Sequence, residues 1–195
     1  MVRPSCRDAL LNAAEAVVLE GGAVRLTLDA VAERAGVSKG GLLYHFPSKG
    51  ALLEGMVARL IERGQIRRQN ALAEMPPGPV RELKAELASY RGRNGCEDRV
   101  SAAILAAIGN EPELMKTIRE YHSDRFSAHE KLGPLFERRA LLLLAADGLF
   151  LMELLQVSPF STTQRAKLIE ELLTMSDELG ARISETDSSN QTVSS

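Results

Sequence analysis

The residues best suited to do chemistry lie together in one short stretch, and they are Lys39, Gly40, Gly41, Tyr44 and His45. A lysine ammonium and a tyrosine hydroxyl can bind phosphate oxygens, and successive glycines let a backbone approach another molecule closely. Ser38 is a good N-cap, so the stretch is predicted to form a short helix that runs to about His45. Where such a helix is the second of a helix-turn-helix, its exposed first turn is where base edges and phosphates are met. The chemistry indicated is therefore recognition of a nucleic acid.

Two short helices are predicted to position this stretch. Thr27 caps the first, which spans Leu28–Ala35, and Gly36 stands where a left-handed turn residue is needed before the second. Two short helices joined by a tight glycine-containing turn make a helix-turn-helix. Small or apolar residues stand where the two helices would cross and pack against each other. They are Val31, Ala32, Val37 and Leu42.

The stretch from Thr27 to Lys49 reads TLDAVAERAGVSKGGLLYHFPSK and strongly resembles the signature of the TetR family of bacterial transcription regulators. At the level of motifs, the resemblance covers about residues 8–55. A histidine directly before Phe46 is a common variant of the pattern. The matching residues at fixed spacing are Thr27, Val31, Ala32, Ala35, Gly36, Val37, Ser38, Gly40, Leu42, Tyr44, Phe46, Lys49 and Leu52.

The resemblance implies that the second helix of the motif enters the DNA major groove and that Tyr44 reaches a phosphate, as would His45 or its backbone. Lys49 follows the Ser48 cap, where helix N-terminal amides already favour an anion. Thr27 can present its own helix N-terminus to a phosphate. The expected DNA-binding residues are Thr27, Ser38, Lys39, Gly40, Gly41, Tyr44, His45 and Lys49.

Each of these residues also has a plain structural explanation. Lys39 could be a solvated lysine, Tyr44 could belong to the core, and the two glycines could mark a frayed helix end. A helical glycine costs about 0.5–1 kcal/mol relative to alanine. Inside this motif, we therefore favour close approach of the backbone to DNA as the reason for Gly40 and Gly41.

The chain as a whole is predicted to be all-α, because apolar residues recur at three- and four-residue spacing and no alternating run predicts a strand. We expect about nine helices, as an N-terminal three-helix DNA-binding domain followed by a C-terminal helical ligand-binding and dimerisation bundle. The expected divisions are a DNA-binding domain over 1–48, a connecting helix over 49–75 that includes Lys49–Glu74, an effector-binding and dimerisation domain over 76–183, and a disordered tail over 184–195. Helices in the third division are expected at about 80–90, 99–109, 112–131, 134–156 and 161–182.

Charge is divided unevenly along the chain. Residues 1–70 hold ten lysines and arginines against seven acids, a net +3, whereas the remainder has a net −5. A positive N-terminal third is compatible with a nucleic-acid-binding head, although an imbalance of this size is common.

The C-terminal helices are predicted to form a homodimer. The segment Ala140–Leu155 is apolar nearly all round, so it must be buried on more than one side. In TetR-like proteins, the last two helices of each subunit form a four-helix interface, and the helices at about 134–156 and 161–182 resemble that pair. The alternative is a single long core helix in a monomer.

The helix over 112–131 is the predicted wall of a small-molecule site. It places His122 and His129 on one stripe with apolar side chains, although a core histidine is the more common reason for such a position. The two histidines are seven residues apart, whereas chelation along a helix needs a spacing of four, so no metal site is expected. The expected effector-binding residues are Met115, Ile118, His122, Arg125, Phe126 and Phe150.

Several other classes of protein are disfavoured. Cys6 and Cys96 lie in no C-x-x-C motif, so two reduced thiols in a cytoplasmic protein are expected, with no cofactor. No export signal and no membrane span are predicted. An enzyme or ligand-storage bundle is the competing function, but we find no nucleophile with a base, no phosphate-cradling loop and no paired Glu-x-x-His.

The predicted function is that of a ligand-responsive repressor that binds a near-palindromic double-stranded DNA operator as a dimer. The residues themselves do not separate this from a regulator that has lost its ligand response, and repression rather than activation rests on the habit of the family.

Overall fold

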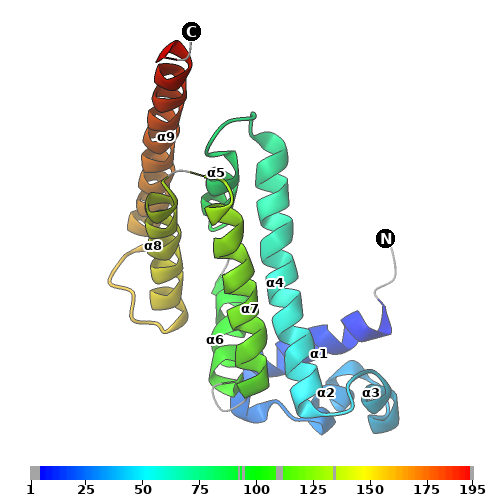
Figure 1. Cartoon of the computed structure of the whole chain (residues 1–195). Helices are drawn as coiled ribbons and strands as arrows, with labels where there is room; N and C mark the ends of the chain where they lie inside the picture. Colours follow the sequence, from blue (N-terminus) through cyan, green and yellow to red (C-terminus); the bar gives the residue numbers. More distant parts are fainter. Residues whose placement is uncertain (1–4, 92, 94, 109–111, 134, 194–195) are drawn as a thin grey trace. The chain divides into compact units, whose positions relative to one another are not determined.

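The computed structural model describes residues 5–91, 93, 95–108, 112–133 and 135–193, without the side chains of 95, 96, 112 and 186–193. The described residues form nine α-helices and one 3-10 helix and contain no strand, which confirms the all-α prediction (Figure 1). None of these helices is both long and apolar enough to cross a membrane. In chain order, the helices are α1 (Cys6–Gly21), η1 (Ala23–Arg25), α2 (Leu28–Ala35), α3 (Lys39–His45), α4 (Lys49–Glu74), α5 (Arg81–Ala88), α6 (Gly95–Ile108), α7 (Pro112–Glu130), α8 (Phe136–Leu154) and α9 (Thr162–Val193).

The chain divides into two compact units. Unit 1 consists of Met1–Arg63 and Asn94–Tyr121, and unit 2 of Gly64–Arg93 and His122–Ser195. Residues of α4 and of α7 therefore belong to both units. This grouping differs from the predicted divisions at 48 and 75, because apolar residues of α6 such as Ile104 pack into the same core as α1.

Local signals determine where the helices of unit 1 begin and end. Gly22 and Gly36 have φ of 71° and 68°, the left-handed region that glycine enters without steric cost, and they end α1 and α2. Phe46 leaves helical geometry before Pro47 and ends α3. Side-chain oxygens cap the starts of α1, α2, α3 and α4 by accepting backbone N–H groups at 3.0–3.1 Å, and they belong to Ser5, Thr27, Ser38 and Ser48.

The core of unit 1 holds α3 firmly against α1, α2 and α4. Leu42 and Phe46 are almost fully buried in it, with Val31 and Ala32 on the facing helix. Gly55 lets α4 pass close to this core, since a Cβ there would lie 2.8 Å from Cε1 of Phe46. Arg59 on α4 also forms an ion pair with Asp8 on α1, with 2.9 Å between Nη2 and Oδ1. The burial of large apolar groups stabilises the unit, at about 25 cal/mol per Å² removed from water.

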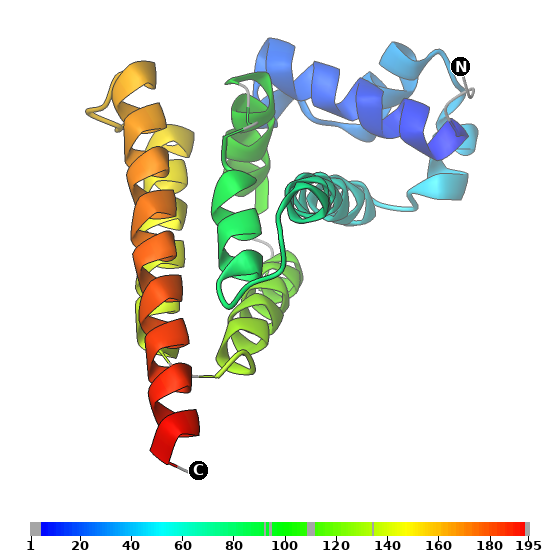
Figure 2. The same ribbon diagram turned by 90° about the horizontal axis from the view of Figure 1, so that it is seen from above.

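Unit 2 is built around α5, α8 and α9. The last two helices run side by side in opposite directions, and α5 packs against both of them (Figures 1 and 2). Gly180 on α9 is required by this packing, because a Cβ there would lie 2.8 Å from Cγ2 of Val80. The apolar core of the unit includes Leu83, Leu87, Leu143, Ala146, Ile169 and Leu173.

The end of α9 corrects one expectation. We predicted no regular structure over 184–195, whereas α9 continues as a helix through Val193. Its last residues are poor helix formers, but no proline or glycine follows Gly180, and extending an existing helix is far easier than starting one. Residues 194 and 195 lie outside the described part of the chain.

Candidate functional site

The helix-turn-helix of unit 1 presents one face of α3 to solvent. Leu42 and Phe46 are buried beneath it, whereas Tyr44 is 85% exposed and points away from the core. Leu43 is also exposed, which the sequence reasoning did not predict. Two adjacent leucines on a helix lie about 100° apart in projection, so one of them had to face outward.

Most of the predicted DNA-binding residues are exposed to solvent. Thr27, Ser38, Lys39, Gly40, Gly41, Tyr44 and Lys49 are exposed, and His45 is half-buried. The rings of Tyr44 and His45 meet edge to face, with centroids 5.1 Å apart. The predicted set occupies the start of α2, the length of α3 and the start of α4, and its role in DNA binding stays a prediction.

Lys39 has a partner within the motif. Its Nζ lies 2.8 Å from Oδ1 of Asp29 on α2, and both side chains remain more than half exposed. An exposed ion pair of this kind contributes about 0–1 kcal/mol, so it costs little to exchange Asp29 for another anion. The pair therefore holds Lys39 in place without withdrawing it from solvent.

Gly40 and Gly41 are not required by the protein's own packing. A Cβ added at Gly40 would meet nothing closer than Oγ of Ser38 at 4.0 Å, and one at Gly41 would lie 3.4 Å from the same atom. Both glycines are exposed and have ordinary helical geometry. Alanine would therefore stabilise the helix at each position, and no close contact among the described residues accounts for glycine there.

Unit 2 contains a cluster of buried charged side chains. The guanidinium of Arg125 on α7 lies 2.8 Å from Oε1 of Glu86 on α5 and 2.7 Å from Oδ2 of Asp147 on α8, and its side chain is 6% exposed. The hydroxyl of Tyr90 donates a hydrogen bond to Asp147 and accepts one from Arg125 at 3.2 Å. Burial raises the pKa of this hydroxyl, so it stays protonated. Arg68 on α4 pairs with the other oxygen of Glu86 at 2.9 Å.

Two histidines of α7 lie near this cluster. Burial and the guanidinium groups of Arg125, Arg68 and Arg139 lower the pKa of His129 to about 4. His129 is therefore neutral at pH 7, and its Nε2, 4.0 Å from Glu86, makes no ion pair there. Burial also lowers the pKa of His122. Among the described residues, no three His, Cys, Asp or Glu side chains form a group that could hold a metal ion.

Comparison with known proteins identifies the family. The family model described as "Bacterial regulatory proteins, tetR family" matches residues 10–56, and "Tetracyclin repressor-like, C-terminal domain" matches residues 81–177. This chain belongs to the TetR family. Its helix-turn-helix is the DNA-binding element of a transcriptional regulator, as the sequence predicted.

Individual relatives agree with this assignment. The transcriptional regulator BetI of Serratia proteamaculans is 27% identical over 89% of this chain and 93% of its own length. The regulator EthR of Mycolicibacterium smegmatis is 28% identical, but the match covers 57% of this chain and only 53% of EthR. Among solved structures, a transcriptional regulator from Rhodococcus sp. Rha1 superposes with a TM-score of 0.68 at 23% identity, over 87% of this chain and 94% of that one.

The predicted effector residues of this TetR protein do not all belong to one unit. Met115 and Ile118 pack against the core of unit 1, whereas His122, Arg125, Phe126 and Phe150 belong to unit 2. The ring of Phe150 meets that of Tyr90 edge to face and carries the guanidinium of Arg93 at 3.8 Å from its centroid. Glu86, Tyr90 and Asp147 were not predicted, because these cluster residues come from segments far apart along the chain.

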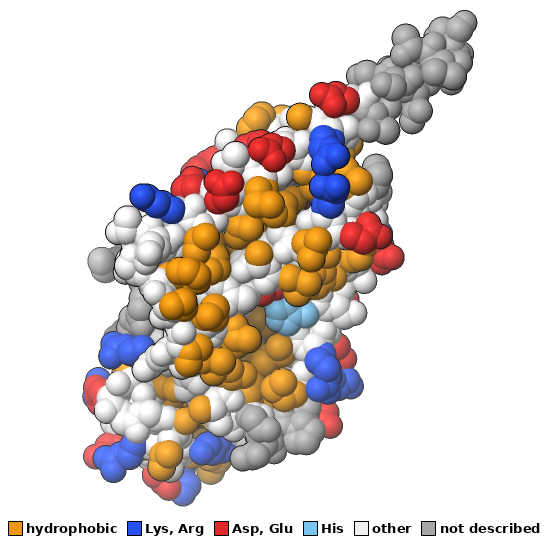
Figure 3. Space-filling view, turned by 90° about the vertical axis from the view of Figure 1, so that its left-hand side faces the viewer, with side chains coloured by type: hydrophobic (Ala, Val, Ile, Leu, Met, Phe, Trp, Pro, Cys, Tyr) orange, Lys and Arg blue, Asp and Glu red, His pale blue; other side chains and the backbone are white. Residues whose placement is uncertain are grey.

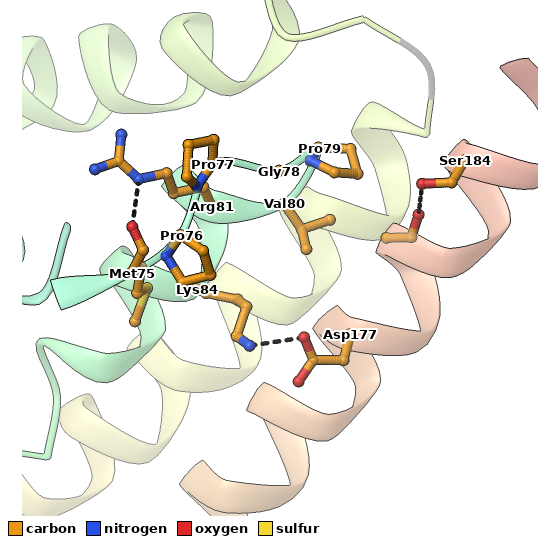
Figure 4. A pocket seen from close by; sticks show the side chains of 11 residues that line it. Met75, Pro76, Pro77, Gly78, Pro79, Val80, Arg81, Lys84, Asp177 and Ser184 are labelled. Atoms are coloured by element: carbon orange, nitrogen blue, oxygen red, sulfur yellow. Dashed lines mark hydrogen bonds and ion pairs between the residues drawn. The ribbon is translucent and has the colours of Figure 1, made fainter. Parts of the chain in front are cut away.

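A groove of about 230 Å³ lies beside the loop between α4 and α5 in unit 2 (Figure 4). Residues 75–81 form one wall of it, and α9 forms the other with Asp177, Gly180 and Ser184. Lys84 and Asp177 reach toward each other across it, with 2.7 Å between Nζ and Oδ1. Lys84 and Asp177 therefore compensate each other, whereas Arg81, which also lines the groove, donates hydrogen bonds to the backbone oxygens of Met75 and Leu72.

An apolar face covers α8 and α9 of unit 2. Figure 3 shows hydrophobic side chains gathered on the side that these helices present. Several large apolar residues of α8 and α9, and Leu155 directly after α8, are about half exposed, and clustered exposure of this kind is unusual. They are Leu141, Leu144, Leu151, Leu155 and Met175.

Proposed function

We propose that this TetR-family regulator is a ligand-responsive repressor that binds a near-palindromic operator as a homodimer, with α3 in the major groove. The observation that carries the proposal is the exposed face of α3, whose glycines no internal contact requires. The second helix of a helix-turn-helix enters the major groove with its first turns against base edges. A regulator of this kind acts on the chromosome, so we expect it in the cytoplasm.

The stripe on α8 supports the homodimer. Leu141, Leu144, Leu151 and Leu155 recur with the three- and four-residue spacing of a coiled-coil seam, and Gly148 occupies the position between the two pairs. A Cβ at Gly148 would meet nothing within 4 Å, so the chain's own packing does not require glycine there. A small residue in the middle of an apolar stripe lets a second helix approach closely. With α9, this stripe would complete a four-helix interface between two copies.

The dimer sets the geometry of the operator. Two copies of α3 related by a two-fold axis read half-sites one helical turn apart, or a multiple of it, on a near-palindromic sequence. An effector bound in the C-terminal part would release the operator by stabilising an arrangement in which the two heads no longer match that spacing. A 100-fold weakening of DNA binding requires that the effector prefer the released state by about 2.7 kcal/mol.

DNA binding is the first test. The purified full chain is titrated onto labelled DNA from just upstream of its own coding region at two salt concentrations, beside K39A and Y44A. We expect retardation at nanomolar protein that weakens steeply with salt and is lost in both variants. K116A is the matched control, because Lys116 is another exposed lysine with a carboxylate partner, Glu120. Binding that survives in K39A and Y44A would contradict the assignment of α3.

The oligomeric state is the second test. L144E places a charge in the middle of the α8 stripe, where it would be buried against the second copy, so we expect a monomer with at least tenfold weaker DNA binding. I66E is the control, since Ile66 on α4 is 48% exposed but lies outside the stripe. Light scattering after size exclusion gives the mass of each. A dimeric L144E would show that the interface lies elsewhere.

A further inference from the structure

Arg139, at the start of α8, is a buried cation with almost no partner. Its residue is 1% exposed, and one nitrogen, Nη2, donates a hydrogen bond to the backbone oxygen of Pro79 at 3.1 Å. Its Nε and Nη1 are buried and find no acceptor among the described residues. Burial lowers its pKa, and no carboxylate offsets this. A buried charge that lacks a counter-charge is unusual in a folded protein and calls for an explanation.

The neighbouring guanidinium groups show what is missing. Arg125 pairs with Glu86 and Asp147, and Arg68 pairs with Glu82 and Glu86. These arginines thus each have two carboxylate partners, whereas Arg139 has none among the described residues. The three carboxylates, Glu82, Glu86 and Asp147, all pair with Arg68 or Arg125, so none of them is left to balance Arg139 where it lies.

His129 provides a second unpartnered group nearby. It is 2% exposed, and its Nδ1 is buried without a hydrogen-bond partner. Arg139 is close enough to contribute to the lowering of the pKa of His129. A neutral imidazole can donate one hydrogen bond or accept one without adding charge. The two orphaned side chains come from the end of α7 and the start of α8, within one unit.

We propose that Arg139 and His129 form a binding site for the carboxylate group of a small organic monocarboxylate. A single negative charge balances Arg139, whereas a dianion such as phosphate would leave an excess of buried negative charge. The planar carboxylate can accept hydrogen bonds from the free N–H groups of the guanidinium, and such charge-assisted bonds are strong in a buried setting. His129 then bonds the same group or a neighbouring hydroxyl.

The site also has a place in the fold that suits regulation. The Pro79 oxygen that holds Arg139 belongs to the loop between α4 and α5, which lines the groove of Figure 4. A carboxylate bound at Arg139 would therefore act directly beside the hydrogen bond that connects Arg139 to this loop, which follows α4. That the carboxylate acts as the effector rests on the proposed function, whereas its binding does not.

Thermal unfolding of the full chain without DNA tests the site. Sodium acetate, butyrate and benzoate are compared with phosphate, sulfate and chloride at matched ionic strength and pH 7. We expect at least one carboxylate to raise the Tm saturably and the concentration for half the effect to rise at least tenfold in R139Q. R138Q is the matched control, because Arg138 is the adjacent and exposed arginine, and its response should equal that of the wild type.

Other results would overturn the proposal. A saturable carboxylate response that persists in R139Q would place binding elsewhere, and a larger response to phosphate than to any carboxylate would refute the ligand class. If R139Q does not fold, R139K keeps the charge without the planar donors and should also show at least a tenfold loss. The same carboxylate is then added to the DNA complex. No release of DNA despite a rise in Tm would reject the effector role and leave the site in place.

Discussion

The face of α3 and the buried cluster around Arg125 use similar side chains in opposite ways. On α3, Lys39 and Tyr44 remain in solvent, and the one ion pair there is exposed. In unit 2, Arg125 and Glu86 are less than a tenth exposed and are joined by short ion pairs. Water screens the first set, so its contacts are weak and exchangeable, whereas the second set lies where an unpaired charge is costly.

The difference distinguishes charged groups that can bind a partner molecule from charged groups that stabilise the fold. A DNA-binding surface must release its internal contacts easily, and the Lys39–Asp29 pair can do so. The Arg125 pairs cannot be broken without leaving buried carboxylates behind. By the same reasoning Arg139, which is buried but unpaired, resembles neither set and marks a place for a ligand.

Removing the centre of the buried cluster should have the largest effect. R125A leaves Asp147 without a cation and Glu86 with Arg68 alone, so we expect a loss of about 3–5 kcal/mol in the free energy of unfolding. Urea unfolding at pH 7 measures it. The control is R91A, which removes a pair with Glu170 whose side chains are 50% and 58% exposed and should cost about 0–1 kcal/mol. Equal losses of unfolding free energy in R125A and R91A would show that the buried pairs stabilise the protein no more than the exposed pair does.

Acid should weaken unit 2 through His129. In the unfolded chain this histidine binds a proton as the pH falls through 6.5, whereas in the folded chain it does so only near 4. The unfolded state therefore holds more protons between these values, and stability falls by about 3 kcal/mol as the pH drops from 6.5 to 4. The charged groups that face His129 are Glu86, Arg68, Arg125 and Arg139.

The variant H129Q isolates this contribution. Its free energy of unfolding should depend less on pH between 6.5 and 4.5 than that of the wild type, as followed by urea unfolding at several pH values. Identical pH profiles would show that protonation of His129 does not destabilise the fold.

Two glycines of α4 sharpen the contrast between glycines that the packing requires and glycines that it does not. G55A forces a Cβ to within 2.8 Å of Phe46 and should destabilise the protein by about 1–3 kcal/mol, as overpacking does. G64A, also on α4, meets nothing closer than 3.9 Å and should stabilise by about 0.5–1 kcal/mol. Thermal unfolding compares the two, and a neutral G55A would mean that Phe46 moves aside at no cost.

A small gain in stability is also expected at Gly40, together with a loss of DNA binding. G40A should stabilise the fold by about 0.5–1 kcal/mol because alanine favours the helix and nothing obstructs its Cβ. It should also weaken operator binding about tenfold, equivalent to ~1.4 kcal/mol, by keeping the backbone away from DNA. Urea unfolding measures the change in stability, and DNA titration of the same sample measures the change in binding. A variant that is more stable and binds DNA normally would refute the close-approach argument.

Much of the DNA-binding unit was predictable because its signals are local. The bounds of α2, α3 and α4 agree with the predicted Leu28–Ala35, the helix to about His45, and Lys49–Glu74. Their capping side chains and Gly36 act within four residues along the chain. Residues 184–193 were predicted wrongly as irregular, because composition alone does not show how far an established helix continues.

The sequence by itself determined the family, the helices of the helix-turn-helix and the residues on its exposed face. Hydrophobic periodicity and helix caps depend on residues within about one helical turn, so a local sequence is enough to predict them. Only the tertiary structure decided which polar groups are buried together. Glu86, Arg125, Arg139 and Asp147 come from three helices, and nothing in their local sequence distinguishes a charge that will be paired from one that will not. The cost of burying a charge depends on what the other helices bring to it, and so the orphaned Arg139 became visible only in the folded chain.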